Sequence, residues 1–153
     1  MILHVMRPDV EDYAKLTEIC VESKRHWGYP EYLIDIWRDE LTITPRYIRH
    51  HNILKITDEH NEILGFGAIN SVNGNGLYEI DHLWVLPKYI GKRIGKVLLE
   101  RLEEIAGPDK TIRVVSDPNA MSFYQNYGYH KVGEVKSKPD GRTLPLLKKI
   151  MKY

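Results

Sequence analysis

The sequence has few of the features that mark secreted or membrane proteins. Its 153 residues include one cysteine, Cys20, and a single thiol cannot form a disulfide within the chain. No apolar run approaches the roughly 20 residues that cross a bilayer as a helix. The apolar start, residues 2–6, is too short for the core of a secretion signal, and Arg7 and Pro8 follow it at once. We therefore expect a cytoplasmic protein without membrane contacts.

An excess of charge is also missing. Lys and Arg number 22 and Asp and Glu 21, which leaves a net charge of +1, whereas nucleic-acid-binding domains usually carry a basic surplus. We expect no nucleic-acid partner. The adjacent His50 and His51 lack the spacing of a zinc site, so we expect no metal. Cys20 falls in the apolar rhythm of a helix, which favours a buried residue over a nucleophile.

The composition is that of a globular chain, because hydrophobic residues make up 42% and charged residues 28%. The length suits one domain, residues 1–153. Apolar periodicity, caps and turn residues predict, in order, a strand at 2–6, helices at 9–26 and 30–41, a short helical turn opened by Thr44 and Pro45, strands at 52–57, 62–71 and 77–86, a helix at 92–106, a strand at 111–116, a helix at 117–127, and strands at 129–136 and 144–151. This order predicts an α+β fold, with helices flanking a mixed, mostly antiparallel sheet of about seven strands.

The segment 83–99 combines an apolar strand, a turn rich in Gly and Lys, and an amphipathic helix. That order places backbone N–H groups and the positive end of a helix dipole beside Lys88, Lys92, Arg93 and Lys96. Such a place binds phosphates. Neither Gly-x-x-x-x-Gly-Lys-Ser/Thr nor Gly-x-Gly-x-x-Gly occurs in the turn, so both nucleotide fingerprints fail.

A second segment, 119–134, starts with Asn119 and contains the pair Phe123-Tyr124 and a Gly-aromatic turn into a strand. Together with residues 85–99, it resembles the GNAT superfamily of acyl-CoA N-acyltransferases. The order of elements is similar to that family along nearly the whole chain. The resemblance implies a splay between the fourth and fifth strands and acetyl-CoA as co-substrate.

Cofactor contacts are implied by the same resemblance. The turn and the helix after it would meet the pyrophosphate, main-chain groups of the fourth strand would meet the pantetheine amides and the oxyanion, and Asn119 would touch the pantetheine arm. Tyr124 would protonate the departing sulfur. The cofactor-binding residues implied in this way are Leu83, Trp84, Val85, Ile90, Gly91, Lys92, Arg93, Ile94, Gly95, Lys96, Asn119 and Tyr124.

Two positions depart from the family pattern. Ile90 stands where Gln or Arg is usual, and Arg93 stands where Gly is usual. We expect Arg93 to take an ordinary φ, so that the turn does not depend on a left-handed backbone there. The same departures keep open a second reading, a non-catalytic module that senses acyl-CoA.

Candidates for the catalytic base lie on the strand 77–86. Strand alternation predicts one face with Glu79, Asp81, Leu83 and Val85, and the other with Ile80, His82 and Trp84. By resemblance, an acidic residue on this strand acts as base or holds a water that does. Glu79 and Asp81 both fit, and two neighbouring carboxylates can split their pKa values. His82 has suitable chemistry but the wrong phase.

The acceptor is predicted less sharply than the cofactor. Trp27 and Tyr29 could wall an acceptor pocket or anchor a helix turn. The carboxylates of the strand favour a cationic amine, whereas Arg25 and Arg142 could grip a carboxylate. We predict a primary amine, small molecule rather than protein, that attacks directly in a ternary complex. The resemblance also leaves a homodimer open.

Overall fold

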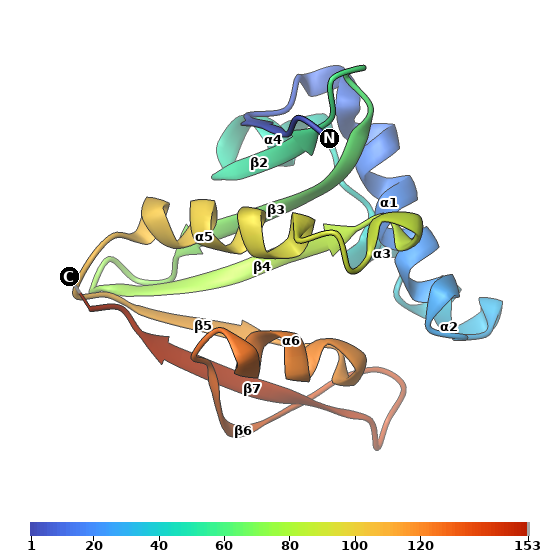
Figure 1. The fold of residues 1–153 in the computed structure, drawn as a ribbon. Helices are drawn as coiled ribbons and strands as arrows, with labels where there is room; N and C mark the ends of the chain where they lie inside the picture. The colour runs from blue at the N-terminus through green and yellow to red at the C-terminus, as the bar shows by residue number, and fades with distance from the viewer. Residues whose placement is uncertain (153) are drawn as a thin grey trace.

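The computed structural model describes residues 1–152, which fold around one 7-stranded sheet (Figure 1). The strand order is β1-β2-β3-β4-β5-β7-β6. Only β4 and β5 run parallel; the other neighbours are antiparallel. The strands are β1 (His4–Met6), β2 (Ile53–Thr57), β3 (Ile63–Ser71), β4 (Leu77–Val85), β5 (Thr111–Val115), β6 (His130–Lys136) and β7 (Thr143–Ile150). The predicted α+β class and mixed sheet are confirmed.

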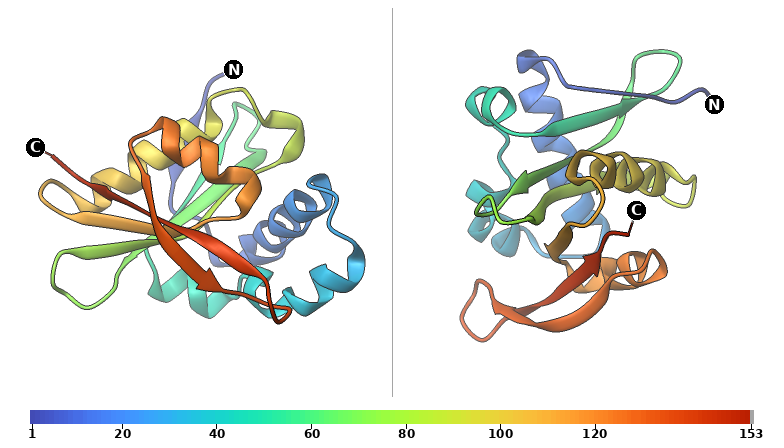
Figure 2. Two further views of the ribbon diagram at one scale, coloured as in Figure 1. Left: turned by 90° about the horizontal axis from the view of Figure 1, so that it is seen from below. Right: turned by 90° about the vertical axis from the view of Figure 1, so that its left-hand side faces the viewer.

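Helices cover both faces of this sheet (Figure 2). They are η1 (Val10–Asp12), α1 (Tyr13–His26), α2 (Glu31–Ile36), α3 (Arg38–Leu41), α4 (Pro45–His50), η2 (Pro87–Tyr89), α5 (Ile94–Ala106), η3 (Pro118–Ala120) and α6 (Met121–Asn126). The helix predicted at 30–41 is split at Trp37, which has φ −91° and ψ 5° and is 1% exposed.

Within residues 1–152, no helix is long and apolar enough to cross a membrane.

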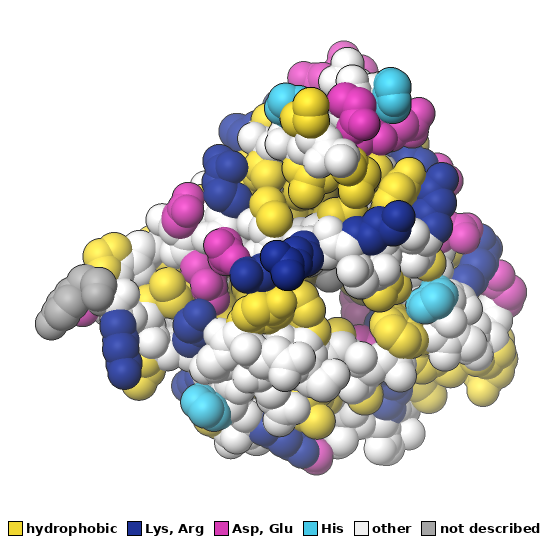
Figure 3. All heavy atoms as spheres, viewed as in Figure 1, with side chains coloured by type: hydrophobic (Ala, Val, Ile, Leu, Met, Phe, Trp, Pro, Cys, Tyr) yellow, Lys and Arg dark blue, Asp and Glu magenta, His cyan; other side chains and the backbone are white. Residues whose placement is uncertain are grey.

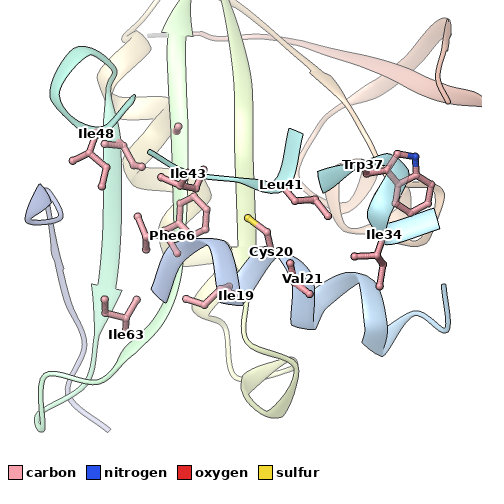
Figure 4. Close-up of a cluster of buried hydrophobic side chains, with 13 residues drawn as sticks. Ile19, Cys20, Val21, Ile34, Trp37, Leu41, Ile43, Ile48, Ile63 and Phe66 are labelled. Carbon is pink, nitrogen blue, oxygen red and sulfur yellow. The ribbon is translucent and has the colours of Figure 1, made fainter. Parts of the chain in front are cut away.

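Apolar side chains of α1 pack against β2 and β3 and form the core of one face. Figure 4 shows Ile19 and Cys20 of α1 close to Phe66 of β3. Cys20 is fully buried, and this burial raises the pKa of its thiol, so the predicted structural role is confirmed. On the other face, Leu98 and Leu102 of α5 are equally buried. The two helix layers therefore fix the position of β4 between them.

A β-bulge in β4 lies at Asp81. Ala68 pairs with His82 and Ile69 pairs with Ile80, so Asp81 has no partner on β3. The extra residue reverses the alternation: Leu83 packs with Ile80 on the α5 side, whereas Trp84 packs on the α1 side. The predicted shared face of Glu79 and Asp81 with Leu83 and Val85 is therefore wrong beyond the bulge.

The strands β4 and β5 pair over a short stretch only. Leu77–Ile80 of β4 lies beside Thr111–Val114 of β5, and the pairing stops there. Beyond the bulge the two strands diverge, as Figure 1 shows, which is consistent with the stronger twist that a bulge gives its strand. The predicted splay is confirmed, and residues 81–85 keep an edge that faces no strand.

Candidate active site

The splay opens into a cleft of about 550 Å³. Its walls come from β4 and β5, from the C-terminal half of α1, from the start of α5, from α6 and from the β6–β7 turn. Figure 3 shows a hollow on this side, with Lys and Arg side chains gathered above it over the α5 face. Nearly all of the predicted cofactor residues line the cleft, namely Leu83, Trp84, Val85, Ile90, Gly91, Arg93, Ile94, Gly95, Lys96, Asn119 and Tyr124; Lys92 does not.

The turn before α5 points unpaired amides outward. Gly91 has φ +85° and Arg93 has φ +65°, so the expectation of an ordinary φ at Arg93 is wrong. Alternating backbone conformations of this kind make a concave nest of N–H groups. No acceptor within residues 1–152 bonds the amides of Gly91, Arg93, Ile94, Gly95 and Lys96, whereas the Val97 amide donates to the Arg93 carbonyl at 3.1 Å. The nest and the first turn of α5 together form an anion-binding surface.

Cationic side chains surround this nest. Lys88, Lys92 and Arg93 are exposed. Lys96 lies one turn further along and its Nζ is 3.8 Å from Glu100, which partly offsets its charge. The positive end of the α5 dipole adds to the same potential. The surface therefore favours a ligand with more than one negative charge.

Tyr124 on α6 closes the inner part of the cleft. Its side chain is 5% exposed, and its hydroxyl makes no hydrogen bond to any residue in the range 1–152. Burial raises the pKa of this phenol, so it keeps its proton at neutral pH. The neighbouring Phe123 packs so tightly on Gly95 that an added Cβ there would lie 3.1 Å from the ring. The small residue thus lets α6 approach α5.

Asp81 lies where the cleft meets a second pocket of about 480 Å³. Its Oδ2 accepts hydrogen bonds from Asn70 Nδ2 at 2.6 Å and from the Tyr47 hydroxyl at 3.3 Å. Partial desolvation raises the pKa of Asp81, and the nearby charge of Glu79 raises it further. Glu79 itself lines only the second pocket, where its carboxylate pairs with Arg113. The two predicted carboxylates therefore have different surroundings.

His82 lines the cleft, and the bulge places its ring on the α1 side of the sheet, 5.6 Å from the ring of Phe66. Its Nδ1 accepts a hydrogen bond from Trp84 Nε1 at 3.0 Å, which leaves the ring proton on Nε2 in the neutral form. Burial lowers the pKa of His82 to about 4, so the ring is neutral at pH 7. Regular alternation along the strand predicts that His82 shares a face with Ile80, and the sequence carries no signal of the bulge that separates them.

No group of three or more potential metal ligands is found within residues 1–152.

Lys24 and Asp117, which the sequence analysis missed, meet in the wall of the cleft. Lys24 Nζ lies 2.7 Å from Asp117 Oδ2, and both side chains are 11% exposed. The same Nζ lies 5.0 Å from the ring centre of Trp37 and 5.4 Å from that of Trp84. The two charged residues are 93 positions apart, so no local pattern could have found the pair.

The predicted acceptor residues lie at the same end of the cleft. Trp27 and Arg142 line it directly. Tyr29 does not line the cleft, but its hydroxyl donates to Asp117 Oδ1 at 3.2 Å and accepts from Arg142 at 3.4 Å. Arg25 is exposed and pairs with Glu22 and Glu31 outside the cleft.

Comparison with known proteins agrees with this geometry. A family model described as an acetyltransferase (GNAT) domain matches residues 38–148. The chain belongs to the GNAT acetyltransferase family. The predicted family and enzyme class are confirmed, and the residues around the cleft can be considered as parts of a GNAT acetyltransferase.

Relatives of this GNAT domain extend the comparison. The peptidyl-lysine N-acetyltransferase YiaC of Escherichia coli (strain K12) is 27% identical over 118 residues, which cover 76% of each chain. The structure of PaiA N-acetyltransferase from Thermoplasma acidophilum, in complex with coenzyme A, superposes with a TM-score of 0.74 at 22% identity and covers 98% of this chain and 99% of that one. A GCN5-related N-acetyltransferase from Rhodopseudomonas palustris gives 0.75 at 22% identity, with 98% and 95% covered. At these identities the solved structures establish the fold alone.

Proposed function

We propose that residues 1–153 form one acetyltransferase domain that moves an acetyl group from acetyl-CoA to the primary amine of a small molecule. The observation that carries this proposal is a single cleft joining three features: the amide nest before α5, the open edge of β4 and the free hydroxyl of Tyr124. The amine attacks directly in a ternary complex, because the thiol of Cys20 is buried in the core, away from the cleft.

The residues present fit acetyl-CoA, which supplies an activated acetyl thioester when bound. The amides of residues 91–96 would hold the pyrophosphate, with Lys88, Lys92 and Arg93 adding charge. Main-chain groups of Leu83–Val85, on the edge left open by the splay, would bond the pantetheine amides and stabilise the oxyanion. Asn119 would reach the pantetheine arm.

Proton transfer needs an acid and a base. Tyr124 suits the acid role, because its phenol stays protonated and no residue in the range 1–152 forms a hydrogen bond with it. The acceptor ammonium, with an ordinary pKa of about 10.4, must lose a proton first. We assign this step to Asp81 or to a water that it holds, and not to Glu79, whose carboxylate is paired with Arg113 outside the cleft. Glu79 supports the base by raising its pKa.

The cellular location, the oligomeric state and the acceptor of the enzyme stay predictions. We propose a cytoplasmic location, because the single thiol is free and buried. A homodimer also remains a prediction; β6 lies at the edge of the sheet and carries Val132, which is 55% exposed. A lysine side chain of a peptide is the second acceptor to consider, since YiaC is named for that substrate.

Release of free thiol from acetyl-CoA across a panel of amines and one lysine-containing peptide tests this function. We expect turnover with at least one small amine, and loss of about 100-fold in kcat for Asp81→Asn. Asp39→Asn, which removes an exposed carboxylate on α3, is the control and should keep full activity. If coenzyme A binds but no amine releases thiol, the chain is an acyl-CoA sensor and the proposal fails.

A further inference from the structure

Arg142 in the β6–β7 turn has a guanidinium group that lies on an aromatic ring inside the cleft. Its guanidinium carbon is 4.4 Å from the ring centre of Trp37. Nη1 donates to Ser137 Oγ at 3.0 Å and Nη2 donates to the Tyr29 hydroxyl at 3.4 Å. Both partners are neutral. Within residues 1–152, no carboxylate forms an ion pair with Arg142.

The other buried or half-buried cations of the cleft are already paired, whereas Arg93 is exposed. Lys24 is neutralised by Asp117. Asp81 is hydrogen-bonded to Asn70 and Tyr47. Glu40 lines the cleft but makes no ion pair with Arg142 in the part of the chain that is described. Within residues 1–152, Arg142 is therefore a half-buried cation of the cleft without a counter-ion, an arrangement that is costly unless a ligand supplies the missing charge.

The guanidinium of Arg142 also has free N–H donors and a restricted orientation, which suit such a ligand. A guanidinium group has five N–H donors, and protein contacts use one on each terminal nitrogen of Arg142. The contact with Trp37 and the hydrogen bonds to Ser137 and Tyr29 restrict the orientation of the group. A fixed planar fork with free donors matches a carboxylate in a bidentate geometry.

We infer that the acceptor is a small amine that also carries a carboxylate, that is, an amino acid. Arg142 binds the carboxylate, while the amine is directed to Asp81, which lines the same cleft. Trp37 and Trp84 line the same cleft and suit an apolar side chain on that amino acid. The inference rests on the proposed function, because it names the second substrate of the same reaction.

Matched pairs of amines test this inference. L-lysine and cadaverine differ by one carboxylate, as do L-tryptophan and tryptamine and L-phenylalanine and phenethylamine. For the amino acid that the wild type uses best, we expect kcat/KM to exceed that for the matching amine without the carboxylate by about 10-fold or more. Arg142→Gln should abolish this preference by lowering the value for the amino acid alone, and Arg142→Lys should restore part of it.

The control is Arg25→Gln, which removes an exposed arginine that is paired outside the cleft. It should leave the preference unchanged. The KM for acetyl-CoA should be the same in all four proteins, and their melting temperatures exclude loss of folding. A wild type that uses the decarboxylated twins equally well, or an Arg142→Gln variant that loses both members of each pair alike, would overturn the inference.

Calorimetry separates this inference from the proposed function. The amino acids are titrated into protein saturated with coenzyme A. Binding that Arg142→Gln abolishes, with no thiol release from acetyl-CoA, would support the carboxylate subsite and refute the transferase. Turnover of amines without any preference for a carboxylate would support the transferase and refute the carboxylate subsite. Absence of both binding and turnover for every pair would refute the subsite.

Discussion

The Nζ of Lys24 lies 2.7 Å from Oδ2 of Asp117, and this ion pair joins α1 to the segment that follows β5. The two elements stand on opposite sides of the splay, so the pair ties the two arms of the sheet together at the wall of the cleft. Burial alone would raise the pKa of Asp117, but Lys24 and hydrogen bonds from Asn119 hold it below its usual value.

Lys24→Met should destabilise the fold by about 2 to 3 kcal/mol, because it leaves the Asp117 carboxylate buried without its counter-ion. Chemical denaturation at pH 7 measures this loss. The stability that Asp117 adds is present above pH 3.8 and is lost as the pH falls through its lower folded pKa. The variant should therefore show a weaker loss of stability in that acidic range.

Lys15→Met is the matched control for this pair. Lys15 lies on the same helix, but its pair with Glu18 has a separation of 3.6 Å and exposed fractions of 36% and 57%. Its removal should change stability by about 0.5 kcal/mol or less. Equal effects of the two substitutions would contradict the view that burial makes the Lys24 pair important.

His82 should make stability depend on pH. Its folded pKa of about 4 lies below the usual 6.5, so the unfolded chain binds more protons between these values and stability falls as the pH drops through that window. The loss cannot exceed about 3 kcal/mol. His82→Gln should flatten the profile from pH 6.5 to 4, whereas His130→Gln, which changes an exposed residue, should leave it as in the wild type.

Tyr124→Phe should lower kcat by about 100-fold and leave the Kd for acetyl-CoA nearly unchanged, because only the proton donor is lost. Steady-state kinetics and calorimetry give the two quantities. Tyr129→Phe removes a phenol from the same buried cluster, one that donates to Glu103 at 2.8 Å. That variant should lose stability and keep kcat. An unchanged kcat for Tyr124→Phe would exclude the acid role.

Arg93→Gly should separate stability from cofactor binding. A left-handed φ is strained for arginine and free for glycine, so the free energy of unfolding should rise by about 1 kcal/mol. The affinity for acetyl-CoA should fall several-fold, since a charge beside the nest is lost. Arg93→Asn, which tolerates the left-handed region, should lose the same affinity with a smaller gain in stability. Tighter binding by either variant would show that the Arg93 charge does not assist the phosphates.

Much of the fold could be read from local patterns. The turn of residues 87–93 and the helix after it, the turn after Tyr127 and the burial of Cys20 depend on neighbouring residues and helical or strand periodicity. The resemblance to GNAT proteins came from two such segments. Helical periodicity predicts one helix at 30–41, because the break at Trp37 depends on a buried indole that donates to the carbonyl of Lys138, far away in the chain.

The sequence by itself therefore determined the kinds and order of the elements, the family and the segments that line the cleft, because these follow from side chains close together in the chain. The tertiary structure alone decided which side chains share a site. The unpaired Asp81 in β4 reverses the alternation of the strand, so that Leu83 shares a face with Ile80 while His82 lies on the other face beside Phe66. Strand register and contacts such as that of Arg142 with Trp37 arise only when distant segments pack, and no local periodicity encodes them.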